Sequence, residues 1–502
     1  MTAKPRFLGD LDPRQYPPIG VRDEIRRNLI RKLRRGESLF PGIIGFDESV
    51  IPQLVNSLLA RHDVVFLGLR GQAKTRLCRL LVNLLDDEVP VIEGSALREH
   101  PLAPITTRSH ERVKAEGKSL PLEWLAREAR YGEKLATPDV TMADLIGDID
   151  PLKAAHRKLD LSNEEVIHYG IIPRLNRGIF AVNELPDLAP RIQVGLLNIL
   201  EERDIQIRGF PLRIPLDILL VFTANPEDYT NRGSIIPPLK DRIASQILTH
   251  YPRSLEEARA ISESEAWCDR GDGLPSVQIP EFFLDILEEI AFRGRESEYV
   301  DQKSGVSARL PIAAREVVVS QVERRLVRDP KAAPQPRIVD LAQIVPAITG
   351  KVELVYEGEQ EGTLQVARHL IGTACRAVFD RHFPDAMREG AEERPPGRAA
   401  PKGEARLKSD RYKPVLDWFS SGNRLDLSDE MDDQSYCAAL EQIPGLEALA
   451  REFLPADSRL GRAAVMELVL EGLHQHSLLA KEDVAAGAAY SDMLGVMLEG
   501  LK

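Results

Sequence analysis

A glycine-containing turn between an apolar run and an amphipathic segment most constrains how this chain folds. The stretch FLGLRGQAKTRL, residues 66–77, follows the apolar residues VV and leads into the helical pattern KTRLCRLLVNLL. The order of these patterns predicts a strand, a tight loop and a helix. Gly68 and Gly71 stand in the loop.

The spacing of this loop is GxxxxGK[ST], with Ala73 in place of the second glycine and then Lys74 and Thr75. Backbone amides at the start of a helix can cradle phosphate. The lysine would reach the β- and γ-phosphates, and the threonine hydroxyl would hold Mg²⁺. An accidental turn is the alternative interpretation, which the strand–loop–helix context disfavours. The candidate nucleotide-binding residues of the loop are Gly68, Gly71, Gln72, Ala73, Lys74, Thr75 and Arg76.

Short apolar runs alternate with helical patterns from residue 40 to about residue 251. The runs are DVVFLG, VPVIEG, GIFAV and DILLVFTA, at residues 63–68, 89–94, 178–182 and 217–224. Apolar runs without polar alternation suit strands that are buried on both faces of a parallel sheet. The repetition of strand and helix predicts a right-handed α/β layer fold.

The run GIFAV ends in Asn183 and Glu184 and is followed by the turn-forming sequence LPDL. P-loop enzymes place a Mg²⁺ carboxylate and a water-polarising glutamate at such a strand end. Glu184 fits the second role, whereas Asn183 can offer the metal only a neutral amide oxygen. Taken alone, this motif leaves open a plain strand followed by a turn.

The segments that follow predict a helix, a hairpin and another buried strand. Residues 189–202 carry apolar positions on one helical face. Residues 205–208 and 212–214 alternate between apolar and polar as the two strands of a hairpin. The next apolar run delivers Asn225 at its end, where it would lie beside Glu184 and could hold the attacking water.

Length, charge and cysteine content limit the classes of function. The 502 residues predict two to four domains, at about 150 residues per domain. The net charge of −12 argues against a protein that coats nucleic acid, so nucleic acid is not an expected partner. The four cysteines form no CxxC pair, which favours a reducing compartment. No signal peptide or membrane span is visible, and we expect a cytoplasmic protein.

The ordered motifs resemble those of the AAA+ ATPases, and more narrowly the magnesium-chelatase ATPase-subunit and MoxR-like group. The resemblance covers about residues 40–327 and rests on the order of GLRGQAKT, TPDVTMADLIGDIDPLKAA, GIIPRLNRGIFAVNELPDL, the hairpin, FTANPEDY and PPLKDRI. Residues 40–49 are similar to the segment before the phosphate loop, and residues 137–150 resemble the helix-2 insert of that group. Minichromosome-maintenance helicases, in the same branch, often carry alanine before the loop lysine, as Ala73 does here.

The resemblance assigns roles by position. Lys74 and Thr75 match the phosphate-loop residues, Glu184 the catalytic glutamate and Asn225 sensor 1. Arg242 matches the arginine finger that acts on ATP held by a neighbouring subunit; a permanently charged guanidinium suits this role.

Arg309 matches sensor 2, with Arg315 as a nearby rival. A finger that acts on the neighbouring subunit implies a ring, expected to be a hexamer. The implied cofactors are ATP and Mg²⁺, and the implied metal-site residues are Thr75 and Asn183. Asn183 departs from the family pattern, which has aspartate there, so we expect weaker metal binding and slow hydrolysis.

The resemblance and the change in pattern together predict the domain organisation. We expect an N-terminal helical extension at 1–39, containing a solvated basic helix over 21–37, and an α/β nucleotide-binding domain at 40–252. A helical lid domain should follow at 253–385. The predicted remainder is a flexible linker rich in Pro, Gly and charge at 386–411 and a helical C-terminal region at 412–502.

The leading hypothesis is an AAA+ ATPase that remodels a partner protein, in this group often one with a von Willebrand factor A domain. This chain has DLSDE at residues 426–430, but it lacks the second serine of a DxSxS metal site and a preceding strand pattern. We therefore interpret the segment as a helix cap and expect the partner to be a separate chain.

Two other hypotheses remain open. A genuine magnesium-chelatase ATPase subunit is one, against which the region after the linker and Asn183 both count. An ATP-binding scaffold without turnover is the other. The GAFTGA loop of transcriptional activators is absent, and the charge gives a DNA helicase no support.

Overall fold

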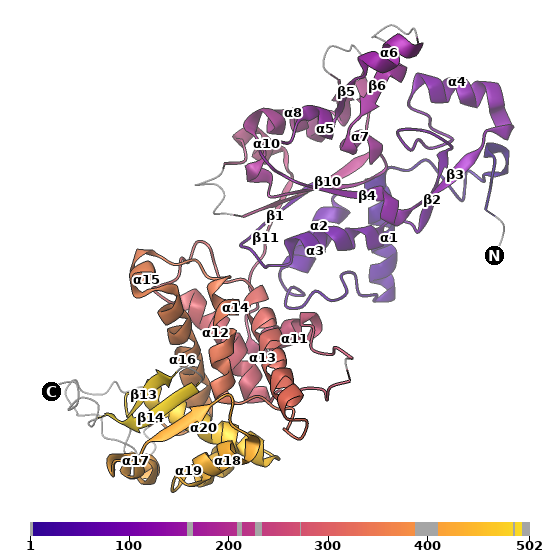
Figure 1. The fold of residues 1–502 in the computed structure, drawn as a ribbon. Coiled ribbons are helices and arrows are strands. Elements are labelled where there is room, and N and C mark those ends of the chain that lie inside the picture. The colour runs from indigo at the N-terminus through magenta and orange to yellow at the C-terminus, as the bar shows by residue number, and fades with distance from the viewer. Residues whose placement is uncertain are drawn as a thin grey trace, which may run out of the picture. The chain divides into compact units, whose positions relative to one another are not determined.

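Five parallel strands form the central sheet, in the order β11-β1-β10-β7-β4 (Figure 1). Every neighbouring pair of these strands is parallel. Because β1 and β10 are buried along their whole length, they need no polar alternation, which confirms the prediction for these runs. The strands are β1 (Val64–Leu67), β4 (Tyr131–Leu135), β7 (Gly178–Asn183), β10 (Ile218–Ala224) and β11 (Ser245–Leu248).

The computed structural model describes residues 4–157, 164–207, 213–225, 233–271, 273–386, 410–484 and 487–493. The chain forms two units, Met1–Tyr251 and Pro252–Lys502. The first holds the parallel sheet. The second holds the predicted helical segments, so the predicted fold class, a P-loop parallel sheet with a helical remainder, is confirmed.

One strand prediction is wrong. The run VPVIEG, residues 89–94, was expected in the parallel sheet, but β2 (Glu88–Ile92) pairs antiparallel with β3 (Leu122–Ala126) in a separate two-stranded sheet. The strand beside β7 at the edge of the parallel sheet is β4. β4 carries two charged residues and is only half-buried, so its sequence lacks the apolar signal of the other strands.

Alternate residues of the central strands enter two different cores. Val64 and Phe66 of β1 pack with three helices on one face. Val65 and Leu67 point to the opposite face. This alternation follows from the two-residue period of a strand. The first face is covered by α1 (Val21–Arg35), α2 (Val50–Leu59) and α3 (Lys74–Leu80), and the second by α8 (Pro190–Glu201) and α10 (Pro237–Arg242).

The helix predicted over 21–37 is present as α1, but the expectation of a solvated helix is wrong for one face. Val21, Ile25 and Leu29 are almost completely buried in the core beside the sheet. On the same face the Glu24 carboxylate accepts hydrogen bonds from the Arg130 guanidinium at 2.7 and 2.6 Å. Both side chains of this ion pair are buried, so α1 is part of the first unit's core.

Substituting Glu24 by Gln should strongly destabilise the first unit. The Arg130 guanidinium would keep its charge in a site with no exposure, and breaking a buried ion pair costs about 3–5 kcal/mol. Chemical denaturation measures the loss. The control is Asp23→Asn on the same helix, because Asp23 pairs with Arg61 at the surface and such pairs contribute at most about 1 kcal/mol. Equal effects of the two substitutions would contradict the structural role of the buried pair.

The predicted hairpin is confirmed where the structure describes it. β8 (Asp204–Gln206) pairs antiparallel with β9 (Arg213–Pro215), while the predicted residues 208 and 212 lie outside the described residues. The predicted helix over 189–202 is α8. The segment from residue 137 onward folds as α5 (Met142–Leu145) and β5 (Gly147–Ile149), and β5 pairs with β6 (Ile167–Tyr169).

The second unit begins with helices that pack side by side. α12 packs against both α16 and α13 (Figure 1). These helices match the predicted helical segments between residues 253 and 380. The elements are α11 (Leu255–Glu265), α12 (Glu281–Glu296), α13 (Arg309–Arg328), the 3-10 helix η7 (Ile338–Ile344), α14 (Val345–Thr349), α15 (Tyr356–Glu361) and α16 (Thr363–His382).

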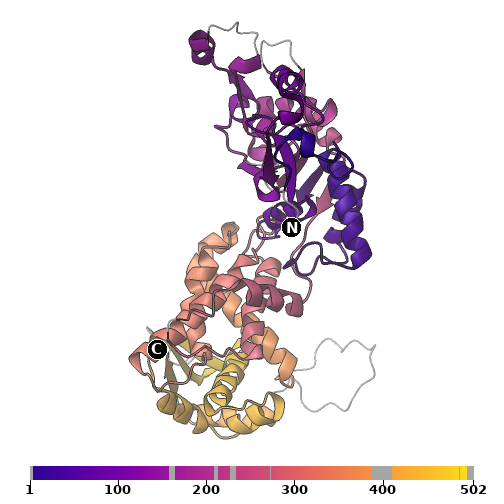
Figure 2. The same cartoon turned by 90° about the vertical axis from the view of Figure 1, so that its right-hand side faces the viewer.

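Residues 410–484 and 487–493 form helices and also a three-stranded antiparallel sheet, which the sequence analysis did not predict (Figure 2). They share one hydrophobic core with α12 and α16. Most of the predicted linker, 386–411, lies outside the described residues. The elements are α17 (Lys413–Ser420), β12 (Leu425–Ser428), α18 (Asp433–Glu441), α19 (Leu446–Phe453), α20 (Arg459–Gln475), β13 (Leu479–Val484) and β14 (Gly487–Asp492).

The interpretation of residues 426–430 as a helix cap is wrong. The first three of these residues belong to strand β12, which pairs with β14. The cap of the following helix, α18, is Asp432, whose side chain accepts a hydrogen bond from the Ser435 amide at 2.8 Å. The sequence signal for this strand was weak because β12 has only four residues.

Candidate nucleotide-binding site

The loop between β1 and α3 has the geometry of a phosphate cradle. A Cβ atom on Gly68 would lie 1.9 Å from Thr249 Oγ1 and 2.2 Å from Gln72 Oε1, so only glycine fits there. Gly71 has a φ of +76° and Ala73 a φ of +52°. Left-handed residues turn successive amides toward one side of a loop, as an anion-binding loop requires.

Ala73 adopts a backbone conformation that favours glycine. It precedes the first residue of α3 in a left-handed conformation. This conformation costs an alanine roughly 1–2 kcal/mol relative to the right-handed one. The loop therefore keeps the turn although the second glycine is replaced, at some cost in backbone strain.

The Lys74 side chain folds into the loop. Its ammonium donates hydrogen bonds to the carbonyl oxygens of Gly68 and Leu69, the latter at 2.9 Å, and only 7% of the residue is exposed. A buried cation inside a ring of backbone groups favours an anionic ligand in the loop. Thr75 follows in the first turn of α3 and is half-buried, and Arg76 lies against Gly42 of the segment that precedes the loop.

Three residues directly after β11 make contacts that the sequence analysis missed, and two of them, Thr249 and Tyr251, bind the phosphate loop. Thr249 Oγ1 donates to Gln72 Oε1 at 2.7 Å, and the Tyr251 hydroxyl donates to the Arg70 carbonyl at 2.9 Å. His250 makes a 2.7 Å hydrogen bond to Ser49. The only available signal was the polar sequence THY at a strand end.

Asn183 and Glu184 lie at the carboxyl end of β7, next to β10. Val182 pairs with Phe222, so the following residues on the two strands are neighbours. The Thr223 hydroxyl accepts a hydrogen bond from the Glu184 amide at 3.1 Å and donates one to Asn183 Oδ1 at 3.3 Å. Glu184 itself has a φ of +55°, which turns the chain sharply after the strand.

Thr223 is a further residue that the sequence analysis missed. It is almost completely buried, and one hydroxyl fixes both residues at the end of β7. Its signal was a single polar residue within an otherwise apolar run, which is common in buried strands.

Substituting Thr223 by Val should destabilise the first unit by about 1–3 kcal/mol. Valine keeps the shape of threonine, but the partly buried Glu184 amide would lose its hydroxyl acceptor. The free energy of unfolding in denaturant measures this loss. Thr223→Ser, which retains the hydroxyl, is the control. A valine variant as stable as the serine variant would show that the two hydrogen bonds contribute nothing.

Asn225 directly follows β10, half-buried, beside the start of the phosphate loop. Leu67 of β1 pairs with Ala224, and the Gly68 amide donates to the Ala224 carbonyl at 3.2 Å. The loop, the end of β7 and Asn225 therefore lie together at the carboxyl ends of three adjacent strands. The first unit has the P-loop NTPase fold.

The resemblance also assigned roles to two arginines. Arg242 lies in the first unit and Arg309 in the second. Arg242, at the end of α10, donates to the Glu201 carboxylate at 2.7 Å and to the Pro238 carbonyl at 3.0 Å. Arg309 is the exposed first residue of α13 in the second unit. In its rival Arg315, two buried guanidinium nitrogens make no hydrogen bond within the described residues.

The described residues contain no group of three or more His, Cys, Asp or Glu side chains arranged to hold a metal ion. The residues at the edge of the sheet still fit a Mg²⁺–nucleotide complex, because Mg²⁺ in such sites uses few protein ligands and relies on phosphate oxygens and water. The Thr75 hydroxyl and the Asn183 amide oxygen are the protein groups that would hold it. No helix in the described part of the chain is long and apolar enough to cross a membrane.

No protein-family model and no curated protein matches the chain. Among solved structures it is similar to a putative ATPase from Cytophaga hutchinsonii, at 16% identity and a TM-score of 0.29, over 70% of this chain and 94% of that one. It is also similar to the complex of BchI and BchD of magnesium chelatase, at 18% identity and a TM-score of 0.33, over 64% and 98%. A third similar structure is NtrX from Brucella abortus in complex with ATP, at 12% identity and a TM-score of 0.38, over 70% of this chain and 66% of that one. The fold assignment rests on the strand order and the phosphate loop of this chain.

Proposed function

We propose that the chain is an AAA+ ATPase of the magnesium-chelatase and MoxR-like group that couples ATP binding and hydrolysis, in a ring, to remodelling of a partner protein. One observation carries the proposal: the loop that holds the buried Lys74 starts beside Asn225 at the end of β10, and Glu184 follows β7, the strand on the other side of β10. A phosphate cradle, a carboxylate and an amide at one sheet edge are the parts that phosphoryl transfer to water needs.

Each of these side chains has a distinct task in the proposed reaction. The loop amides and the Lys74 ammonium bind the β- and γ-phosphates and keep them in place. Glu184 accepts a proton from the attacking water, and the Asn225 amide orients that water. Bound Mg²⁺ would neutralise phosphate charge. Catalysis of this kind rests on positioning and electrostatics, so the rigid strand ends matter as much as the side chains.

Asn183 sets the proposed limit on the rate. Its amide oxygen is neutral and already accepts the Thr223 hydroxyl, so it adds less to Mg²⁺ binding than the usual aspartate would. We expect hydrolysis that is slow and needs a high Mg²⁺ concentration.

Substituting Glu184 by Gln should lower phosphate release by about 100-fold or more, because general-base catalysis contributes about 10²–10⁴. ATP binding should persist, since the phosphate loop is intact. A phosphate-release assay and equilibrium binding of a fluorescent ATP analogue measure the two effects. Glu202→Gln is the control, because Glu202 is an exposed carboxylate at the end of α8.

If the native protein releases no more phosphate than the Glu184→Gln variant, the ATPase proposal fails. The chain would then be a scaffold that binds ATP without turnover. The same variant, holding ATP, is also the bait for the partner, which we propose to be a separate protein with a von Willebrand factor A domain. Capture of porphyrin-synthesis proteins instead would favour the magnesium-chelatase alternative.

We further propose that Arg242 acts on ATP bound by a neighbouring subunit. It lies on α10, engaged with Glu201, and no described contact joins it to the phosphate loop of its own chain. A guanidinium supplied by a neighbour is worth about 10³–10⁵ in rate in related chemistry.

Mixing two inactive variants tests this role. Arg242→Ala subunits keep an intact phosphate loop, and Lys74→Ala subunits keep an intact finger, so the mixture should regain part of the native phosphate release. Each variant alone should stay inactive. Mixing Arg242→Ala with Arg242→Ala/Lys74→Ala is the matched control and should restore nothing. Activity that fails to return in the first mixture, in rings that contain both variants, would contradict action between subunits.

A further inference from the structure

The second unit contains a cavity that the proposed function does not use. Its volume is about 590 Å³, and it is lined by η7, α16, α20, β13 and β14. Sites for small organic ligands have volumes of about 300–1,000 Å³. All the residues that line this cavity belong to the second unit, and none of them is a candidate ATP-binding residue.

Helix α20 forms the polar floor of this cavity. Glu467 and Glu471 stand one turn apart on it, and both are almost completely buried. Glu471 is fully satisfied: Lys481 and Tyr490 donate to one of its oxygens at 2.8 and 2.9 Å, and Gln475 to the other at 3.1 Å. Burial acts to raise the pKa of Glu471, but the Lys481 charge and these hydrogen bonds outweigh it, and the pKa is lowered.

Glu467 has a different environment. The Tyr436 hydroxyl donates to its Oε2 at 2.5 Å, but its Oε1 makes no hydrogen bond within the described residues. The pKa of Glu467 is raised to about 7, chiefly by burial and also by the nearby Asp340 charge, although the Tyr436 hydrogen bond, the Val339 amide and the Lys481 charge act in the opposite direction. A buried carboxylate with one oxygen lacking a donor is unfavourable unless a ligand supplies that donor.

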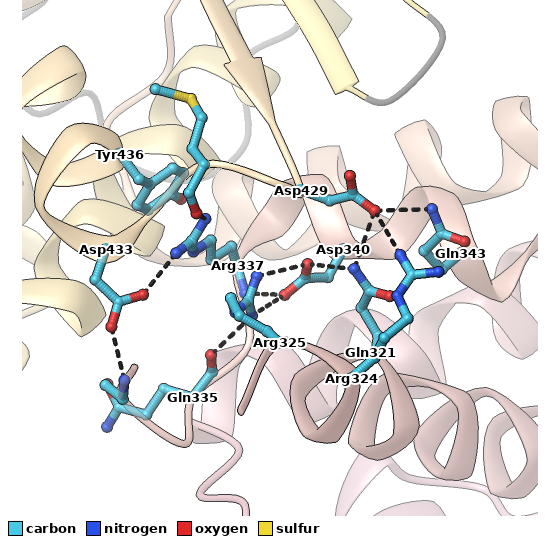
Figure 3. Close-up of polar contacts among 12 residues, drawn as sticks. Gln321, Arg324, Arg325, Gln335, Arg337, Asp340, Gln343, Asp429, Asp433 and Tyr436 are labelled. Atoms are coloured by element: carbon cyan, nitrogen blue, oxygen red, sulfur yellow. Dashed lines mark hydrogen bonds and ion pairs between the residues drawn. The ribbon is translucent and has the colours of Figure 1, made fainter. Parts of the chain in front are cut away.

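Asp429, which also lines the cavity, has a second carboxylate oxygen without a donor. Its Oδ2 accepts hydrogen bonds from Gln321 and Gln343, both at 3.0 Å, and from Arg324 at 3.1 Å. Its Oδ1 makes none within the described residues, and Figure 3 shows it pointing away from those three side chains. Asp429 lines the cavity together with Glu467.

Two carboxylate oxygens without donors call for a ligand with several N–H groups. A metal ion is not indicated, because the described residues hold no cluster of three or more ligating side chains. The remaining wall includes apolar side chains such as Val366 and Ile371 on α16. We infer that the cavity binds a small organic cation, whose guanidinium or primary ammonium group donates to Glu467 and Asp429 and whose apolar part packs on α16.

Agmatine, which carries a guanidinium and an ammonium on a short chain, is the test probe, and 1,4-butanediol is its uncharged counterpart. Calorimetry on the full chain should detect agmatine and not the diol. Glu467→Gln should weaken binding at least tenfold, the loss of about one charge-assisted hydrogen bond. Glu361→Gln, at an exposed position of the same wall, is the matched control and should change little. Neither the Glu467→Gln nor the Glu361→Gln substitution should change the affinity for ATP.

Binding should also depend on pH in one direction. A cation favours the ionised carboxylate, so affinity should rise between about pH 6 and pH 8 as Glu467 loses its proton, and the Glu467→Gln variant should lack this rise. If that variant fails to fold, Leu364→Trp replaces it. Leu364 lines the cavity and is half-exposed, so the larger ring should block the cavity without disturbing the core.

Three results would overturn the inference. One is native protein that binds agmatine no better than butanediol. The others are equal agmatine binding by the native and Glu467→Gln proteins, and equal binding by the folded Leu364→Trp protein.

Discussion

The parallel pairing of β1, β10 and β7 is the constraint on which the candidate site depends. Its register sets Leu67 beside Ala224 and Val182 beside Phe222, so the three chain segments that leave these strands start side by side. A shift of one residue would turn every strand side chain to the opposite face and exchange the two cores. The buried alternation on both faces therefore fixes the site as firmly as it fixes the fold.

Much of the first unit could be predicted from local pattern. The apolar runs at β1, β7 and β10 follow from the covering of both faces of the sheet by helices. The phosphate-loop motif also predicts the strand before it and the helix after it. β2 and β4 could not be assigned in the same way. Their partners lie far along the chain, and β4 carries charges, since an edge strand has one side free of a neighbouring strand.

The residues of the candidate site also fall into those that the sequence pattern predicts and those that it does not. The positions of Lys74, Glu184 and Asn225 could be expected, because each follows directly from a strand end. Thr223 and Tyr251 could not, because their importance comes from contacts with residues 39 and 181 positions away. A threonine in a buried strand and a tyrosine shortly after a strand have no special appearance in a sequence, and only the folded structure shows what they contact.

Helix α20 joins the two parts of the second unit. It is buried on nearly all sides, and it lies in the core that residues 410–484 and 487–493 share with α12 and α16. Neither part can therefore bury its own apolar surface without the other. A chain that ended after residue 386 would leave the apolar face of α16 exposed to water, so the second unit is one cooperative folding unit rather than a helical layer with an attached module.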